Sequence, residues 1–268
     1  MKSILPLYQK YNFSKGECIV KKRKHLFVMN LELRNKRAIL ILSFFVIAVF
    51  AICCTCFEQN DVKETSALIS GNTLVVIDAG HGGVDGGAVS INGAFEKDIN
   101  LSIALKLRSI LLLNGFDVIM TRDCDMSIYD SSLEDGTIRQ KKVSDINNRI
   151  AILNNNPNAI LISIHQNTFD SPDVKGVQVF FADNDSSSLL GDIMQKRLMK
   201  DLDQSGDRPA KKAYKDIKLM NSIKNTGILI ECGFLSNPEE ESKLLDESYQ
   251  GKIAFAIMSA LYEYLGEN

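Results

Sequence analysis

LVVIDAGHGGVDGGAVSINGAFE, residues 74–96, is the stretch that decides the fold of this chain. It opens with an apolar run that is typical of a buried strand and that ends at Asp78. A glycine-dense turn follows and carries His81, and Glu96 then opens a helical pattern. Glycine lets the backbone pack close to a ligand because it has no Cβ. The stretch therefore predicts a strand that leads into a binding loop, with one imidazole presented near the end of the strand.

Strand-like apolar runs and amphipathic helical patterns alternate along the rest of the chain. Further strands are expected at 116–121, 159–164, 176–182 and 227–230, and helices at 97–113, 145–155, 187–202, 219–224, from 237 onward and at 249–265. A long polar loop is expected over 123–144. This alternation predicts an α/β fold, with one domain built on a twisted, mainly parallel sheet and helices on both faces.

The N-terminal part of the chain has a different composition. Residues 1–37 are basic, residues 38–57 carry no charge, and residues 58–72 form a short polar linker to the domain at 73–268. As a helix, the uncharged run would be about 30 Å long, enough to cross a membrane. Basic residues before it and acidic residues after it predict a transmembrane anchor, with the domain outside the cytoplasmic face. A cleaved signal segment, which would release a secreted domain, is the alternative.

The composition of the whole chain excludes two kinds of protein. The formal net charge is -2, which gives no electrostatic basis for binding nucleic acid. Of six cysteines, only Cys124 and Cys232 fall in the predicted domain, so it has no disulfide framework. The apolar content of 45% is ample for a buried core. The domain is therefore expected to be stabilised by packing rather than by cross-links.

Polar side chains follow three of the expected strands. His81 comes shortly after the first strand, His165 ends the third, and Glu231 follows the fifth. In an open α/β sheet, ligands bind beyond the carboxyl ends of the strands. Two imidazoles and a carboxylate, from His81, His165 and Glu96, would leave one position of a tetrahedral zinc ion open for water. Glu231 lies amid apolar residues, where a charged carboxylate needs either a pairing partner or a functional role. We interpret it as a general base.

Each of these residues also has a simpler interpretation. A lone histidine is more often a satisfied core residue than a ligand. Glu96 could be a helix N-terminal charge, and Glu231 could be a surface residue. Asp78 or Asp85 could orient a ligand imidazole, or either could simply form a turn. Asn167 could contact substrate or be a turn residue.

Several segments, in this order, resemble the zinc-dependent N-acetylmuramoyl-L-alanine amidases of the Amidase 3 type. They are VVIDAGHGG (75–83), GAFEKDINL (93–101), VIMTR (118–122), SIHQN (163–167) and ILIECGFLSN (228–237). The resemblance spans about residues 73–265. It implies a twisted sheet flanked by helices, zinc bound by His81, Glu96 and His165, and Glu231 as the catalytic residue.

The resemblance also implies a reaction, which is hydrolysis of the amide between N-acetylmuramic acid and L-alanine in peptidoglycan. An anchor followed by a lone domain, together with SIHQNTF and TIRQKKVSD, is similar to the CwlD-type sporulation branch. That branch strips peptides from muramic acid so that spore cortex acquires muramic lactam, which matters for germination. The partners expected are peptidoglycan, the membrane and an unidentified activating protein.

Two other functions stay open at this point. A cell-wall cysteine peptidase would use Cys232, although a papain-like nucleophile begins a helix and Cys232 follows a strand. A non-catalytic peptidoglycan-binding module is the second alternative. Arg122 and Arg149 could bind substrate carboxylates, although pairing with nearby acids is favoured.

Overall fold

Strand β3, Ile160–Asn167, lies at the centre of a six-stranded sheet in the order β2-β1-β3-β6-β4-β5. The computed structural model describes residues 73–267. The other strands are β1 (Leu74–Ala79), β2 (Asp117–Met120), β4 (Gln178–Phe181), β5 (Lys211–Lys212) and β6 (Gly227–Phe234). Strands β2, β1, β3 and β6 are parallel to one another. Their carboxyl ends therefore meet at one edge of the sheet.

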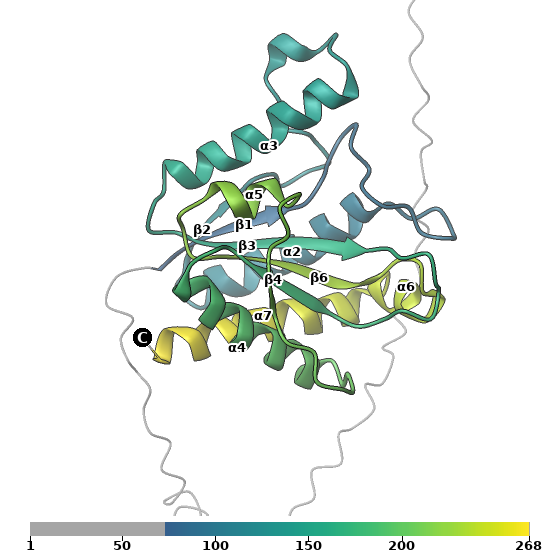
Figure 1. The fold of residues 1–268 in the computed structure, drawn as a ribbon, viewed down its shortest axis with the longest axis vertical. Helices are drawn as coiled ribbons and strands as arrows, with labels where there is room; N and C mark the ends of the chain where they lie inside the picture. The colour runs from purple at the N-terminus through teal and green to yellow at the C-terminus, as the bar shows by residue number, and fades with distance from the viewer. Residues whose placement is uncertain (1–72, 268) are drawn as a thin grey trace, which may run out of the picture. The chain divides into compact units, whose positions relative to one another are not determined.

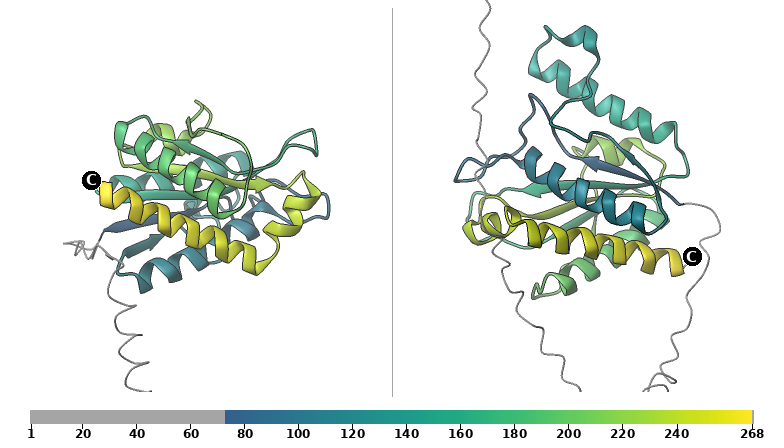
Figure 2. Two further views of the ribbon diagram at one scale, coloured as in Figure 1. Left: turned by 90° about the horizontal axis from the view of Figure 1, so that it is seen from below. Right: turned by 180° about the vertical axis from the view of Figure 1, so that it is seen from behind.

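Helices cover both faces of this sheet, as the sequence predicts (Figure 1). One face carries α2 (Glu96–Leu113), α4 (Asp185–Asp201) and α7 (Glu247–Glu267). The views in Figure 2 agree that α4 and α7 lie side by side there. The other face carries α3 (Ile138–Asn154) and the short α5 (Lys218–Ser222). The short helices η1 (Ser131–Leu133) and α6 (Pro238–Leu244) lie in the connections.

Alternate side chains of the strands supply a core on each face. Val75 and Ile77 pack into the larger core with α2, α4 and α7, whereas Val76 packs into the smaller core with α3 and α5. In the central strand, Ile162 likewise packs into the larger core and Leu161 into the smaller one. A strand that is buried on both faces reads as a continuous apolar run, which is why β1 and β3 were visible in the sequence.

The sheet is mainly parallel, as predicted, but its edge beyond β6 has two features that the sequence did not indicate. β4 is antiparallel to β6, and the two-residue strand β5, parallel to β4, was not predicted. Both residues of β5 are exposed lysines, so no apolar pattern marks it. Strand direction also has no local sequence signal, because it depends on the path of the connection rather than on the strand itself.

Helix α3 begins earlier than the sequence analysis placed it. The polar loop expected over 123–144 is wrong for residues 138–144, which form the first two turns of the helix. These turns are mostly exposed, so they lack apolar periodicity. A capping box marks the true start. The side chain of Thr137 accepts a hydrogen bond from the backbone of Gln140, and the side chain of Gln140 accepts one from the backbone of Thr137.

Within residues 73–267, no helix combines the length and the apolar character that a membrane span requires. The predicted basic segment 1–37, anchor 38–57 and linker 58–72 lie outside the described residues.

A buried ion pair fastens four elements together beneath the first loop. Asp78, near the end of β1, pairs with Arg149 of α3. The same carboxylate accepts hydrogen bonds from Thr121, just after β2, at 2.9 Å and from Ser163 of β3 at 2.6 Å. Burial by itself raises the pKa of Asp78, but the charge of Arg149 and these donors outweigh it and lower the pKa to about 2.

This network predicts the behaviour of the Asp78→Asn variant. It is expected to lower the free energy of unfolding by about 3 kcal/mol at pH 7, because Arg149 would lose a buried carboxylate partner. The folded pKa, about 2, lies below the unfolded value of 3.8, so the carboxylate stabilises the fold above about pH 4 and ceases to do so as the pH falls toward 2. The difference from wild type should therefore shrink below about pH 4.

Urea unfolding at a series of pH values measures this difference. Asp201→Asn is the matched control, because Asp201 pairs with the partly exposed Arg197 and its substitution should cost less than about 1 kcal/mol. Equal stability of Asp78→Asn and wild type at pH 7, or a difference that grows on acidification, would contradict the account.

Candidate metal centre

The structure brings His81, Glu96 and His165 together at the carboxyl edge of the sheet. One ligand atom from each residue lies within 4.8 Å of the others. The Glu96 carboxylate lies between the two imidazoles, with Oε2 3.2 Å from Nε2 of His81 and Oε1 3.0 Å from Nδ1 of His165. The two rings are edge to face, with centroids 5.0 Å apart. Three residues far apart in sequence thus converge on one point.

His81 is held in a left-handed backbone conformation, with φ of 61°. Such a φ is costly for a residue with a Cβ and persists only where its surroundings enforce it. Arg149 donates to the carbonyl oxygen of His81 at 2.8 Å. Asp85 contacts Nδ1 of the ring at 2.9 Å, which leaves Nε2 facing the other two residues. An acceptor on the far nitrogen is typical of a metal-binding histidine.

Two glycines let the backbone lie against these side chains. A Cβ at Gly80 would overlap the His165 ring, and a Cβ at Gly87, where φ is 68°, would overlap Glu96 and His81. The density of glycine in the opening stretch therefore reflects close packing around the site.

Glu96 is the first residue of α2 and is firmly positioned. Its carboxylate accepts hydrogen bonds from the backbone of Ala88 at 2.8 Å and of Gln166 at 3.0 Å, and from the Asn100 side chain at 3.2 Å. Burial by itself would raise the pKa of Glu96. The hydrogen bonds and charges of His165 and His81 outweigh burial and hold the pKa well below its usual range. Glu96 is therefore a fixed carboxylate anion.

Glu231 lies beside His165, its register partner on the neighbouring strand β6. Within residues 73–267, its Oε2 is one of two buried side-chain oxygens that have no hydrogen-bond partner, and Oε1 of Gln166 is the other. Burial raises the pKa of Glu231 to about 7, although the charge of His165 partly offsets that rise. A carboxyl group with such a pKa near neutrality is suited to accept and return a proton.

A cavity of about 320 Å³ opens over these residues. His81, His165 and Glu231 line its floor. Its walls include Lys142, Asp145, Ile146 and Arg149 of α3, and Ile217, Lys218 and Leu219 at the start of α5. The cavity is therefore large enough for part of a peptide or sugar, and it reaches the two imidazoles and Glu231.

The remaining predicted residues are placed as follows. Asp85 contacts the His81 imidazole, whereas Asp78 contacts Arg149, Thr121 and Ser163 instead of an imidazole. The side chain of Asn167 accepts a hydrogen bond from its own neighbour in sequence, and Asn167 does not line the cavity.

The two arginines bind the backbone of the loop that carries His81. Arg122 donates to the carbonyl oxygens of Ala79 and Gly80, and Arg149 to those of Ala79 and His81. Sequence reasoning favoured a structural role for both but did not locate these bonds. The sequence analysis also missed that Lys142 and Arg149 lie on one face of the same helix, because it started that helix at residue 145. The T-x-x-Q capping box at 137–140 was the sequence signal for the earlier start.

Cys232 is a poor candidate for a nucleophile. Its side chain is 1% exposed and belongs to the larger core, on the face of the sheet opposite to that of Glu231. Burial raises the pKa of its thiol well above the usual range, so the thiolate is scarce. The cysteine-peptidase alternative therefore lacks an accessible, ionised sulfur.

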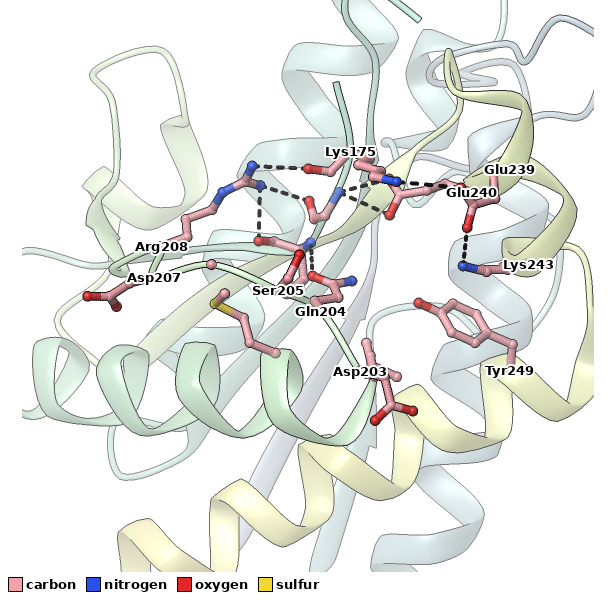
Figure 3. Close-up of a pocket in the computed structure, with 15 residues that line it drawn as sticks. Lys175, Asp203, Gln204, Ser205, Asp207, Arg208, Glu239, Glu240, Lys243 and Tyr249 are labelled. Atoms are coloured by element: carbon pink, nitrogen blue, oxygen red, sulfur yellow. Dashed lines mark hydrogen bonds and ion pairs between the residues drawn. The ribbon is translucent and has the colours of Figure 1, made fainter. Parts of the chain in front are cut away.

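A second cavity, of about 380 Å³, lies between the connection that follows α4, helix α6 and the start of α7 (Figure 3). Its principal polar side chains already bind the backbone. Glu240 accepts from the amides of Gly176 and Phe234, and Arg208 donates to three successive carbonyls, those of Lys175, Gly176 and Val177. No histidine lines it. These side chains fix the backbone of neighbouring segments, and they do not form a reaction centre.

The donor set at the first cavity fits zinc. Two imidazole nitrogens and one carboxylate are ligands that zinc prefers, and a three-residue set leaves a coordination position for water or substrate. Glu96 is ionised and the far nitrogen of His81 has an acceptor, so both are prepared to bind a cation.

Comparison with known proteins agrees with this chemistry. Residues 75–263 match the Amidase 3 family model, N-acetylmuramoyl-L-alanine amidase. The germination-specific N-acetylmuramoyl-L-alanine amidase of Bacillus subtilis is 33% identical over 79% of this chain and 87% of its own length. Escherichia coli AmiA, an N-acetylmuramoyl-L-alanine amidase, is 27% identical over 75% of this chain and 79% of its own.

Solved structures of amidases have the same fold. The CwlD amidase of Clostridioides difficile, in complex with the GerS lipoprotein, has a TM-score of 0.70 and 39% identity, and the match covers 74% of this chain and all of that one (100%). The amidase AmiC2 of Nostoc punctiforme has a TM-score of 0.62 and 29% identity, with 73% and 98% covered. The chain therefore belongs to the Amidase 3 family of N-acetylmuramoyl-L-alanine amidases, as its sequence motifs predicted.

Proposed function

We propose that this peptidoglycan amidase is zinc-dependent and that His81, Glu96 and His165 hold the ion. The observation that supports this most strongly is the convergence of these three side chains beside a carboxyl oxygen of Glu231 that has no partner. A ligand set with a free acid next to it is the arrangement that metal-assisted hydrolysis requires. The scissile bond is the amide between the lactyl group of N-acetylmuramic acid and L-alanine.

When bound, the metal supplies Lewis-acid polarisation of the lactyl carbonyl and lowers the pKa of water. Glu231 takes the proton from the attacking water and delivers it to the nitrogen of alanine as the amide breaks. Burial pushes the pKa of Glu231 upward, toward the range in which a carboxyl group can accept and return a proton near neutral pH. Glu96 cannot share this role, because it is held ionised by its neighbours.

The biological setting that we propose is spore cortex maturation, in which removal of the peptide precedes formation of muramic lactam. Support comes from the likeness to the germination-specific amidase of Bacillus subtilis and to the CwlD amidase of Clostridioides difficile. Cortex peptidoglycan is then the substrate.

We also propose a protein partner and a membrane anchor. The related CwlD amidase was solved in complex with a lipoprotein, and a comparable partner would fit an enzyme that works beside a membrane. The uncharged run 38–57, flanked by basic and then acidic residues, supports an anchor with the amidase domain outside the cytoplasmic face.

Digestion of purified peptidoglycan tests the proposed reaction. Mass spectrometry should find free peptides that begin with L-alanine, together with glycan strands whose muramic acid has a free lactyl carboxyl group. Cleavage within the peptide or within the glycan, with no peptide that starts at L-alanine, would overturn the proposal. Chain that binds peptidoglycan without any cleavage would favour the non-catalytic alternative.

Substitutions separate the metal ligands from the base. Glu231→Gln should keep the metal content of wild type and lose about 10²–10⁴-fold in kcat, because the proton acceptor is removed. His81→Ala should lose both metal and activity. Metal analysis and peptide release from the same samples measure the two effects.

Glu239→Gln is the control for these variants, because Glu239 is an exposed glutamate outside the cavity that should affect neither metal nor rate. An active Glu231→Gln enzyme would remove Glu231 from the role of base. Retention of metal in His81→Ala would remove His81 from the ligand set.

A further inference from the structure

Three cationic side chains line the cavity over the metal centre, namely Arg149, Lys142 and Lys218. The substrate that we propose is a peptide on a sugar, and its stem continues after L-alanine with an isoglutamyl residue. The α-carboxyl group of that residue is either free or amidated. A cation placed in this cavity could distinguish the two forms, because only the free carboxylate is charged.

Arg149 is not available for this contact. Its side chain is 3% exposed, and it donates to the carboxylates of Asp78 and Asp145 and to the carbonyls of Ala79 and His81. A buried guanidinium with these bonds made would lose them by turning to a ligand. Its role is to hold the loop.

Lys142 differs from Arg149 in exposure and in free donors. Its side chain is 49% exposed, and one contact is made, from Nζ to Oδ1 of Asp85 at 2.7 Å. An ammonium group has three donors, so this contact leaves two for a ligand. Lys142 therefore presents a charge to the cavity without being buried or saturated.

Position also favours Lys142 over Lys218. The second oxygen of Asp85 contacts the His81 ring at 2.9 Å, so one carboxylate separates the Lys142 ammonium from a residue of the metal centre. Lys142 is fixed on α3, where residues 142, 145, 146 and 149 form one face toward the cavity. Lys218 is exposed and donates to Asn147 at 2.7 Å, on the outer side of the same helix.

We propose that Lys142 is a specificity-determining residue that binds the free α-carboxylate of the second stem-peptide residue. This rests on the proposed function, because it assumes that the alanyl amide lies at the metal centre. The carboxylate then lies one residue further along, at most about 7 Å from the scissile nitrogen. Asp85 holds Nζ one carboxylate away from the Nδ1 side of the His81 ring, and Lys142 lines the same cavity as that ring.

The simpler account of Lys142 is that its contact with Asp85 is an ordinary exposed ion pair, which stabilises little and selects nothing. The two accounts differ in a measurable preference. They are compared with two soluble muropeptides that are identical except that the second stem residue has a free or an amidated α-carboxyl group.

The preference is the ratio of kcat/KM for the free acid to that for the amide, measured on one sample of each protein. The folded fraction and the metal content cancel in this ratio. Wild type should prefer the free acid about tenfold, as expected for a lost hydrogen bond to a charged group. Lys142→Gln should bring the ratio close to one, and Lys142→Arg should restore most of it.

Lys141→Gln is the matched control, because Lys141 is the neighbouring lysine on the same helix, does not line the cavity and lies over the Tyr129 ring instead. It should keep the preference of wild type. A wild type without preference, or a Lys142→Gln enzyme that keeps it, would overturn the assignment while leaving the amidase reaction intact. Failure of wild type to release peptide from either compound would instead overturn the proposed function, and this inference with it.

Discussion

The ion pair between Asp78 and Arg149 connects the sheet to α3, the helix that lines the cavity over the proposed metal centre. Removing two charges from water is costly unless hydrogen bonds satisfy them. Here Thr121 and Ser163 donate hydrogen bonds to the carboxylate of Asp78. Asp145 and two backbone carbonyls accept hydrogen bonds from the guanidinium of Arg149. One of those carbonyls belongs to His81. The interaction that docks α3 onto β1 therefore also holds the left-handed turn that presents the first imidazole.

The chemistry then depends on two glutamates in opposite environments. Glu96 is surrounded by donors and imidazoles and stays ionised, as the proposed role of a metal ligand requires. Glu231 lies beside them with its buried Oε2 unpartnered, and its pKa rises to about 7. Titratable groups whose pKa values are driven apart in this way mark different roles in one reaction. The register of β3 and β6 maintains the contrast, because it places Glu231 directly beside His165.

Much of this arrangement was visible in the sequence, for identifiable reasons. β1, β3 and β6 are buried on both faces, so they read as apolar runs, and the polar residues that interrupt or follow them stand out. The expected ends of β3 and β6 were too early, because each strand continues past its polar residue, to Asn167 and Phe234. Helix α3 was misplaced because its first turns are exposed and polar. The antiparallel direction of β4 leaves no local pattern in the sequence, and neither does the exposed strand β5. The contact of Arg149 with Asp78 and that of Lys142 with Asp85 join residues 71 and 57 positions apart, which single-sequence periodicity cannot reveal.

X-ray absorption at the zinc edge tests most directly whether one ion joins the three residues. The purified protein, loaded with zinc, should show a shell of nitrogen and oxygen ligands at about 2.0–2.1 Å, with the outer-shell scattering of two imidazoles. Sulfur at about 2.3 Å, or a spectrum with no imidazole contribution, would contradict the metal centre on which this account of the amidase rests.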